Sequence, residues 1–200
     1  PSNLKLTAGT TLTLSDAIDA LVNKSANDVA VVVAERLGGS ESKFAKMMTE
    51  KAHALGMINT TFRNASGLPD PLQVSTARDL ALLSQSLLSV HSAQYAYFSD
   101  REFRWGKRVY KNHNELLGKV YGVDGIKTGY TNASGYNLAA SAVRNGRRLI
   151  VVVLGGQSSA RRNRVRTAAR AADARSNGRP RVSNGEASST VIVAPSPASA

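Results

Sequence analysis

The stretch Val123-Asp124-Gly125-Ile126-Lys127-Thr128-Gly129-Tyr130-Thr131 places a lysine, a hydroxyl and a glycine in succession between two apolar segments. Side chains on a strand alternate between faces, so Lys127 and Gly129 share one face and Thr128 takes the other. A twist or a bulge at Gly129 would let Thr128 lean towards the same cleft. A cation, a hydroxyl and a bare glycine backbone form a clamp for an extended peptide that ends in a carboxylate. The alternative is a solvated edge strand.

Strands are also expected on both sides of this stretch, and helices before it. Two hairpins are predicted: Glu102–Trp105 with Arg108–Lys111 across Gly106-Lys107, and Tyr136–Arg144 with Arg147–Leu154 across Asn145-Gly146. Four helices are predicted to begin at Thr13, at the Ser25-Ala26-Asn27-Asp28 break, at Ser40 and at Thr76, and a short one includes Tyr95, Tyr97 and Phe98. A basic helix over about 159–174 closes the pattern. The expected fold is α+β, with a helical region packed on an antiparallel sheet.

The composition fits one globular domain with a tail. The chain has 200 residues, 42% of them apolar, and residues 1–175 are expected to form the domain. Residues 176–200 are rich in Ser, Pro, Ala and Gly, which predicts a disordered linker or tail. Cysteine is absent, so disulfides and thiolate metal sites are excluded. The apolar runs are too short to span a bilayer, and residues 1–5 do not resemble a signal peptide.

The formal net charge of +12 indicates an anionic partner. Much of this charge comes from a run of arginines between Arg161 and Arg181. The simplest interpretation is a solvated terminal helix and tail, and an anionic membrane surface or wall polymer comes second. Nucleic acid is not expected, because no aromatic residues interleave with these arginines to stack on bases.

Several common site motifs are missing. The sequence has no phosphate-binding loop, no Gly-x-Gly-x-x-Gly, no His-Glu-x-x-His zinc motif and no Gly-x-Ser-x-Gly elbow. The histidines, His53, His91 and His113, lie in unrelated segments. We interpret each as a surface or core histidine rather than a base.

Two short motifs remain, Ser25-x-Asn27 at a helix break and Lys127-Thr128-Gly129 on a strand. A hydroxyl held at a helix junction can relay a proton. The Asn27 amide can donate to a substrate carbonyl and accept from a substrate N–H. Lys127 can stabilise negative charge that develops nearby. The simpler interpretation of Ser25-Ala26-Asn27 is an ordinary helix N-cap.

Taken together, these motifs resemble two of the three motifs of the penicillin-recognising active-serine enzymes, whose third is Ser-x-x-Lys. The wider sequence is similar to the D-alanyl-D-alanine carboxypeptidases of the low-molecular-mass penicillin-binding proteins, from about residue 2 to about residue 170. The blocks that carry the resemblance are residues 25–39, Leu55-Gly56-Met57, Thr61-Phe62-Arg63-Asn64, Gly67-Leu68-Pro69-Asp70, Thr76-Ala77-Arg78-Asp79-Leu80, Asp124–Gly129 and Ala133–Leu138.

The resemblance implies a β-lactamase/transpeptidase-like fold and a serine-type hydrolase of the periplasm or cell envelope. Its substrate would be a peptidoglycan stem peptide that ends in D-Ala-D-Ala, with β-lactam antibiotics as inhibitors and no metal or organic cofactor. By motif, Ser25 would relay a proton to the leaving amine and Asn27 would hold the substrate amide. Lys127 and Thr128 would bind the terminal carboxylate beside Gly129, and the N–H of Tyr130 would form one arm of the oxyanion hole.

The sequence departs from the family pattern in one respect. The family's Ser-x-x-Lys motif lies several tens of residues before Ser-x-Asn, and Ser25 is too near the start for that. The strings Ser2-Asn3-Leu4-Lys5 and Ser40-Glu41-Ser42-Lys43 do not fit in position. We therefore expect a partial catalytic domain without its nucleophile segment and first strands, inactive as it stands. The alternatives are a non-catalytic relative that binds wall peptide or a partner protein, and a basic surface or nucleic-acid binder.

Overall fold

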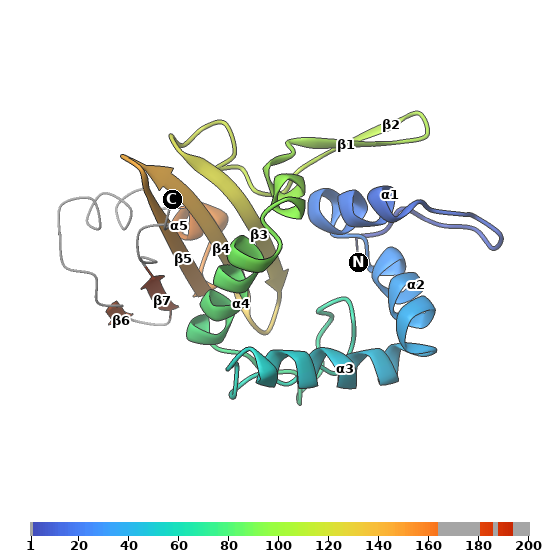
Figure 1. Cartoon of the computed structure of the whole chain (residues 1–200), viewed down its shortest axis with the longest axis horizontal. Coiled ribbons are helices and arrows are strands. Elements are labelled where there is room, and N and C mark those ends of the chain that lie inside the picture. Colours follow the sequence, from blue (N-terminus) through green and yellow to red (C-terminus); the bar gives the residue numbers. More distant parts are fainter. Residues whose placement is uncertain (1, 164–180, 186–187, 194–200) are drawn as a thin grey trace.

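The computed structural model describes residues 2–163, 181–185 and 188–193. Its helices lie where the sequence predicts them (Figure 1). They are α1 (Leu14–Asp19), which continues into the π-helical turn η1 (Ala20–Lys24), α2 (Asn27–Gly38), α3 (Glu41–Ala54), α4 (Ala77–Val90), the 3-10 helix η2 (Gln94–Ser99) and α5 (Ser159–Arg162). The side-chain oxygens of Thr13, Ser40 and Thr76 cap α1, α3 and α4, as expected. The expected continuation of α5 beyond Asn163 lies outside the described residues.

The predicted strands pair in two antiparallel sheets. The hairpin of β1 (Glu102–Trp105) and β2 (Arg108–Lys111) forms the smaller sheet. The larger has the order β3-β4-β5-β7-β6, with bounds Val123–Thr131, Gly135–Arg144, Arg147–Gly156, Ser188–Val193 and Arg181–Gly185. Asn145 and Gly146 both have positive φ, of 50° and 71°, as the tight turn between β4 and β5 requires. The α+β fold with a helical region on an antiparallel sheet is thus confirmed.

Two strands, β6 and β7, lie within the stretch from Ser176 that we expected to be disordered. The ladder pairs Ile150 of β5 with Val193, and Val152 with Val191. The run Thr190-Val191-Ile192-Val193 is β-branched throughout, which suits a pleated surface. The expectation is therefore wrong for 181–185 and 188–193. The other residues of 176–200 lie outside the described part, and the division of the chain at residue 175 stays a prediction.

The sheet is covered on both faces. Ala77 and Ala81 of α4 pack against Ile150 and Val152, and Figure 1 shows α4 lying across the sheet. The alternate β5 residues, Val151 and Val153, pack on the other face in a cluster with Leu116, Leu138 and Ala140. Burial on both faces explains why β5 is a continuous apolar run rather than an alternating one.

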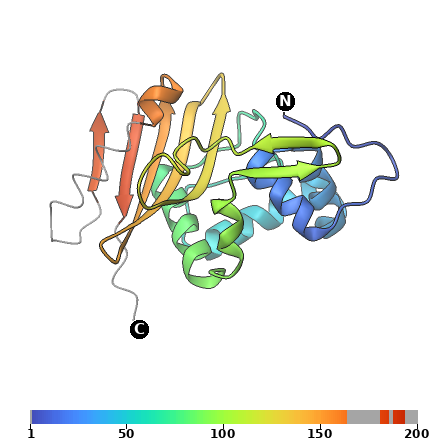
Figure 2. The same cartoon turned by 90° about the horizontal axis from the view of Figure 1, so that it is seen from above.

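The helical region has its own core, which the small hairpin completes. Phe103 of β1 is 5% exposed and packs with Ala17, Ala20 and Ala26, together with Leu4 and Val29. Figure 2 shows the β1–β2 hairpin running along the first helical segment. This packing fixes the junction between η1 and α2, where Ser25 and Asn27 lie.

A buried carboxylate joins α4 to the loop after α3. Asp79 is 1% exposed, and its Oδ2 accepts hydrogen bonds from the Asn59 N–H (2.9 Å) and the Thr60 hydroxyl (2.7 Å). The Thr60 hydroxyl also lies 2.9 Å from the Ser75 hydroxyl. Removing this carboxylate leaves two donors in the interior without an acceptor.

We predict that Asp79→Ala lowers the free energy of unfolding by about 2–3 kcal/mol, because buried donors that lose their partner keep their desolvation cost. Urea denaturation followed by circular dichroism measures this change. Asp100→Ala, at an exposed position, is the matched control and should change stability by less than about 0.5 kcal/mol. Equal effects of the two substitutions would contradict the structural role of Asp79.

Candidate active site

Strand β3 carries the Lys127-Thr128-Gly129 motif and forms the edge of the described sheet. It pairs regularly with β4 from Gly125 to Thr131, so of the two ways considered for Thr128 to lean towards the cleft, a bulge at Gly129 is absent. The register shift lies instead between Val123 and Gly125, where Asp124 has no partner in the ladder. Because the bulge precedes Lys127, it sets the register in which the rest of β3 pairs with β4.

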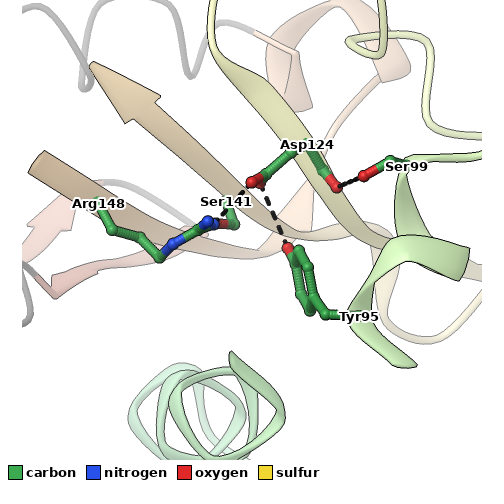
Figure 3. Close-up of polar contacts among 5 residues, drawn as sticks. All are labelled: Tyr95, Ser99, Asp124, Ser141 and Arg148. Carbon is green, nitrogen blue, oxygen red and sulfur yellow. Dashed lines mark hydrogen bonds and ion pairs between the residues drawn. The ribbon is translucent and has the colours of Figure 1, made fainter. Parts of the chain in front are cut away.

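Polar contacts from Arg148 of β5 and from η2 hold Asp124, and Ser141 of β4 bonds to the same arginine (Figure 3). Its Oδ2 lies 2.8 Å from Arg148 Nη1 of β5, and this nitrogen also donates to Ser141 Oγ of β4 at 2.6 Å. The hydroxyl of Tyr95 in η2 donates to Asp124 Oδ1 at 3.4 Å, and the Ser99 hydroxyl donates to the Asp124 carbonyl at 2.8 Å. The start of β3 is therefore tied to β4, to β5 and to η2.

Gly125 lets η2 approach this closely. A Cβ at position 125 would collide with the Tyr95 hydroxyl, so any other residue here would displace that side chain. Burial is the main cause that raises the pKa of Tyr95 above its ordinary value. The phenol thus stays protonated and remains a hydrogen-bond donor.

The Ser25-Ala26-Asn27 segment is not an ordinary side-chain cap. Ala26 is the N-cap residue of α2, and no side chain caps that helix end. Ser25 has a left-handed backbone with φ of 55°, which is uncommon for a residue other than glycine. The Asn27 N–H donates to the Ser2 carbonyl at 2.8 Å. Within the described residues, the Ser25 hydroxyl and the Asn27 amide make no side-chain hydrogen bond, so both are free to meet a ligand.

A cavity of about 570 Å³ brings the two motifs together. Ser25 and Asn27 line it, and so do the consecutive residues Lys127–Thr131. Because residues of both strand faces contribute, the cavity follows the edge of β3 rather than one face. The sequence-predicted residues, Ser25, Asn27, Lys127, Thr128, Gly129 and Tyr130, thus all lie at one cavity, and the catalytic or binding role of each stays a prediction.

The structure adds lining residues that the sequence did not single out. His113 is among them, although we interpreted it as an ordinary surface or core histidine. Arg162 is another: it is 6% exposed, although it belongs to the arginine run interpreted as solvated. Ser2 also lines the cavity, but its hydroxyl donates to the Lys24 carbonyl at 2.7 Å. Ser40, from the other Ser-x-x-Lys string, accepts from the Lys43 N–H as the cap of α3.

Positive charge dominates the electrostatics of the cavity. Burial, and then the charge of Arg162, lower the pKa of the Lys127 ammonium to about 8. Lys127 Nζ donates to the Thr128 carbonyl at 3.1 Å. Desolvation, followed by Lys127, Lys24 and Arg162, lowers the pKa of His113. Burial is thus the main cost of carrying charge in this cavity, and repulsion among the cations adds to that cost, which an entering anion would offset.

Within the described residues, no group of three or more His, Asp or Glu side chains could hold a metal ion. No helix of that part of the chain has the length and apolar character that crossing a membrane requires.

Comparison with known proteins gives consistent matches. The peptidase family S11, described as D-alanyl-D-alanine carboxypeptidase, matches residues 1–158. Over 154 residues the chain is 40% identical to D-alanyl-D-alanine carboxypeptidase DacC of Escherichia coli K12, covering 76% of this chain and 38% of DacC. Over 166 residues it is 37% identical to DacF of Bacillus subtilis, covering 81% of this chain and 43% of DacF.

Solved structures show the same likeness. D-alanyl-D-alanine carboxypeptidase DacD from Francisella tularensis superposes with a TM-score of 0.83 at 26% identity, over 93% of this chain and 60% of DacD. Penicillin-binding protein D2 from Listeria monocytogenes, in its ampicillin bound form, gives 0.77 at 34% identity, over 87% of this chain and 72% of that protein. The chain belongs to the S11 family of D-alanyl-D-alanine carboxypeptidases. It spans about two fifths of the length of the two curated relatives described here.

The lowered pKa of Lys127 predicts a specific pH dependence of stability. Between about pH 8 and the ordinary lysine value of 10.5, the unfolded chain binds a proton that the folded chain has lost, so the free energy of unfolding rises with pH. In Lys127→Met this contribution is absent. We expect the wild-type protein to gain about 2–3 kcal/mol over the variant between pH 7 and pH 10, as measured by urea titrations at each pH. Parallel profiles would show that the lysine has an ordinary pKa.

Proposed function

We propose that this chain supplies the substrate-recognising part of a serine-type D-Ala-D-Ala carboxypeptidase, which removes the terminal D-alanine of peptidoglycan stem peptides. The observation that carries the proposal is the meeting of Ser25, Asn27 and the β3 segment Lys127–Tyr130 at one cavity. Their geometry suits an extended peptide laid along the edge of β3. Family membership provides the reaction class.

In the proposed reaction, a serine hydroxyl attacks the carbonyl between the two D-alanines and forms an ester with the acyl part. The nitrogen of the terminal D-alanine takes a proton, which Ser25 relays, and D-alanine leaves. Water then attacks the ester and releases the shortened peptide, which regenerates the serine. Asn27 holds the substrate amide, and Lys127 and Thr128 hold the terminal carboxylate beside Gly129. The Tyr130 N–H donates to the oxyanion.

The Ser-x-x-Lys residues would come from a segment other than the strings in this chain. The hydroxyls of Ser2 and Ser40 are already hydrogen-bonded to backbone groups. Lys24, next to Ser25, has its ammonium 5.3 Å from the centre of the Tyr110 ring. No lysine of the described part is therefore bonded to one of these three serines to activate it.

A second candidate function is non-catalytic binding of wall peptide or of a partner protein. It is favoured because Ser25, Asn27 and the β3 segment meet at one cavity, while none of the three serines considered is bonded to a lysine in the described part of the chain. β-Lactams are proposed ligands, because the Listeria relative is described in ampicillin bound and cefotaxime bound forms. We place the protein in the periplasm or cell envelope, with an anionic membrane surface as a further partner and no nucleic acid.

We expect the 200-residue chain alone to form no covalent adduct with a fluorescent penicillin and to release no D-alanine from a D-Ala-D-Ala peptide. A hydroxyl without an adjacent base is a weak nucleophile. Gel fluorescence and intact-mass spectrometry measure the adduct. A stoichiometric ester on Ser2, Ser25 or Ser40 would show that the nucleophile lies in this chain after all.

The assignment of Lys127 is tested in a version that carries a family Ser-x-x-Lys segment ahead of this chain. Lys127→Ala should raise the barrier to acylation by about 2–4 kcal/mol, because a charge aimed at a developing anion is lost. Lys107→Ala, at an exposed turn, is the control and should acylate at the parent rate. Stopped-flow acylation with a chromogenic β-lactam gives the rates. An extended protein that binds D-Ala-D-Ala peptide but never acylates would instead support the non-catalytic function.

A further inference from the structure

The function proposed above leaves one titratable group of the cavity without a task. His113 lines the cavity with Lys127, and its side chain is exposed to solvent. Its ring makes no hydrogen bond within the described residues. The other two histidines differ: His53 Nε2 lies 2.9 Å from the Thr60 carbonyl, and His91 ends α4 at an exposed position. Only His113 of the three lines this cavity.

The chain on both sides of His113 is held firmly. The Asn112 N–H donates to the Arg101 carbonyl at 2.8 Å, and the Asn112 side-chain amide donates to the Asp100 carbonyl at 2.9 Å. Asn112 Oδ1 accepts from the Asn114 N–H at 2.8 Å, and Asn114 Oδ1 accepts from the Leu116 N–H at 3.2 Å. The flanking asparagines thus fix the backbone and leave the imidazole free, which is the arrangement expected of a ligand-contacting group.

The charges around His113 are mainly positive. Lys127 of β3 is its strongest charged neighbour, followed by Lys24 of η1 and Arg162 of α5. Glu115, on the same segment, has its carboxylate 3.4 Å from the Asn163 side-chain amide. Together with desolvation, the three cations keep the pKa of His113 low, so the imidazole is neutral near pH 7.

A ligand carboxylate beside Lys127 reverses this balance. Desolvation of the imidazole remains, but the anion offsets the cations that also oppose its protonation, so the imidazole takes up a proton more readily in the complex than in the empty cavity. Linkage then requires that protonation of the histidine strengthen binding of the anion by the same factor. A C-terminal carboxylate has a pKa near 3.5 and stays ionised throughout this range.

We propose that His113 is a specificity-determining residue of the cavity. When a peptide that ends in a D-alanine carboxylate binds, His113 takes up a proton. The added positive charge favours that carboxylate over uncharged peptide ends, and this preference grows as the pH falls below neutral. The proposal rests on the function proposed above, which assigns the carboxylate end of the ligand to Lys127. It differs from that function because it assigns proton uptake to a residue outside both sequence motifs.

The test is an NMR titration of the 200-residue chain. The imidazole resonances of His53, His91 and His113 are followed from pH 5 to pH 8, alone and with saturating diacetyl-L-lysyl-D-alanyl-D-alanine or its C-terminal amide. His113→Gln assigns the resonance. We expect the acid to raise the pKa of His113 by about one unit, the equivalent of a tenfold change in affinity. The amide should leave it unchanged, and the other two histidines should be insensitive to both peptides.

Variants separate this role from a structural one. In the parent chain, affinity for the acid should rise about fivefold from pH 7.5 to pH 5.5. In His113→Gln it should stay flat at the weaker value, and in His113→Lys flat at the stronger value. His91→Gln, the matched control at an exposed position, should keep the parent profile.

Each remaining outcome counts against the proposal. If the acid binds and perturbs Lys127 but leaves the pKa of His113 unchanged, the inference is wrong and the proposed function stands. If acid and amide bind equally well at every pH, neither Lys127 nor His113 recognises the carboxylate, and both proposals fail. Failure of both peptides to bind at millimolar concentration has the same consequence.

Discussion

The ion pair between Asp124 and Arg148 is the contact on which the site depends. β3 forms the edge of the described sheet, so one of its sides lacks the ladder that holds an inner strand. A slip of one residue would exchange the faces of Lys127 and Thr128. The Asp124 bulge, bonded to Arg148, Tyr95 and Ser99, opposes that slip. It leaves the following edge free to face the cavity.

The charge of the cavity follows from the elements that meet there. Lys127 comes from the sheet edge, Arg162 from the short helix after β5, and His113 from the segment between β2 and β3. Burial first, and then the closeness of these groups to one another, disfavours their charged forms and lowers the pKa values of Lys127 and His113. Both effects cost stability in the empty protein, and an anion that enters offsets the repulsion. The net charge of the whole chain does not reveal the positive charge of this cavity, because it does not say which cations lie together.

The helical region contributes to the site through a backbone conformation rather than through helix capping. Ser25 adopts a left-handed conformation between η1 and α2, and the cap of α2 is Ala26, which has no polar side chain. Backbone strain at such a position is maintained by the surrounding packing, here the Phe103 cluster under the β1–β2 hairpin. The hydroxyl and the Asn27 amide are thereby left uncommitted at the cavity.

The sequence by itself determined the elements and the two motifs. Local signals sufficed there: capping residues set helix starts, and Asn145-Gly146 between two apolar runs set a hairpin. It did not determine the bulge at Asp124, the sheet strands after residue 180, or the presence of His113 and Arg162 at the cavity. These depend on contacts between residues far apart in the chain, such as Asp124 with Arg148 and β5 with β7. Only the tertiary structure decides which distant groups meet, because many pairings satisfy the same local pattern and packing selects one of them.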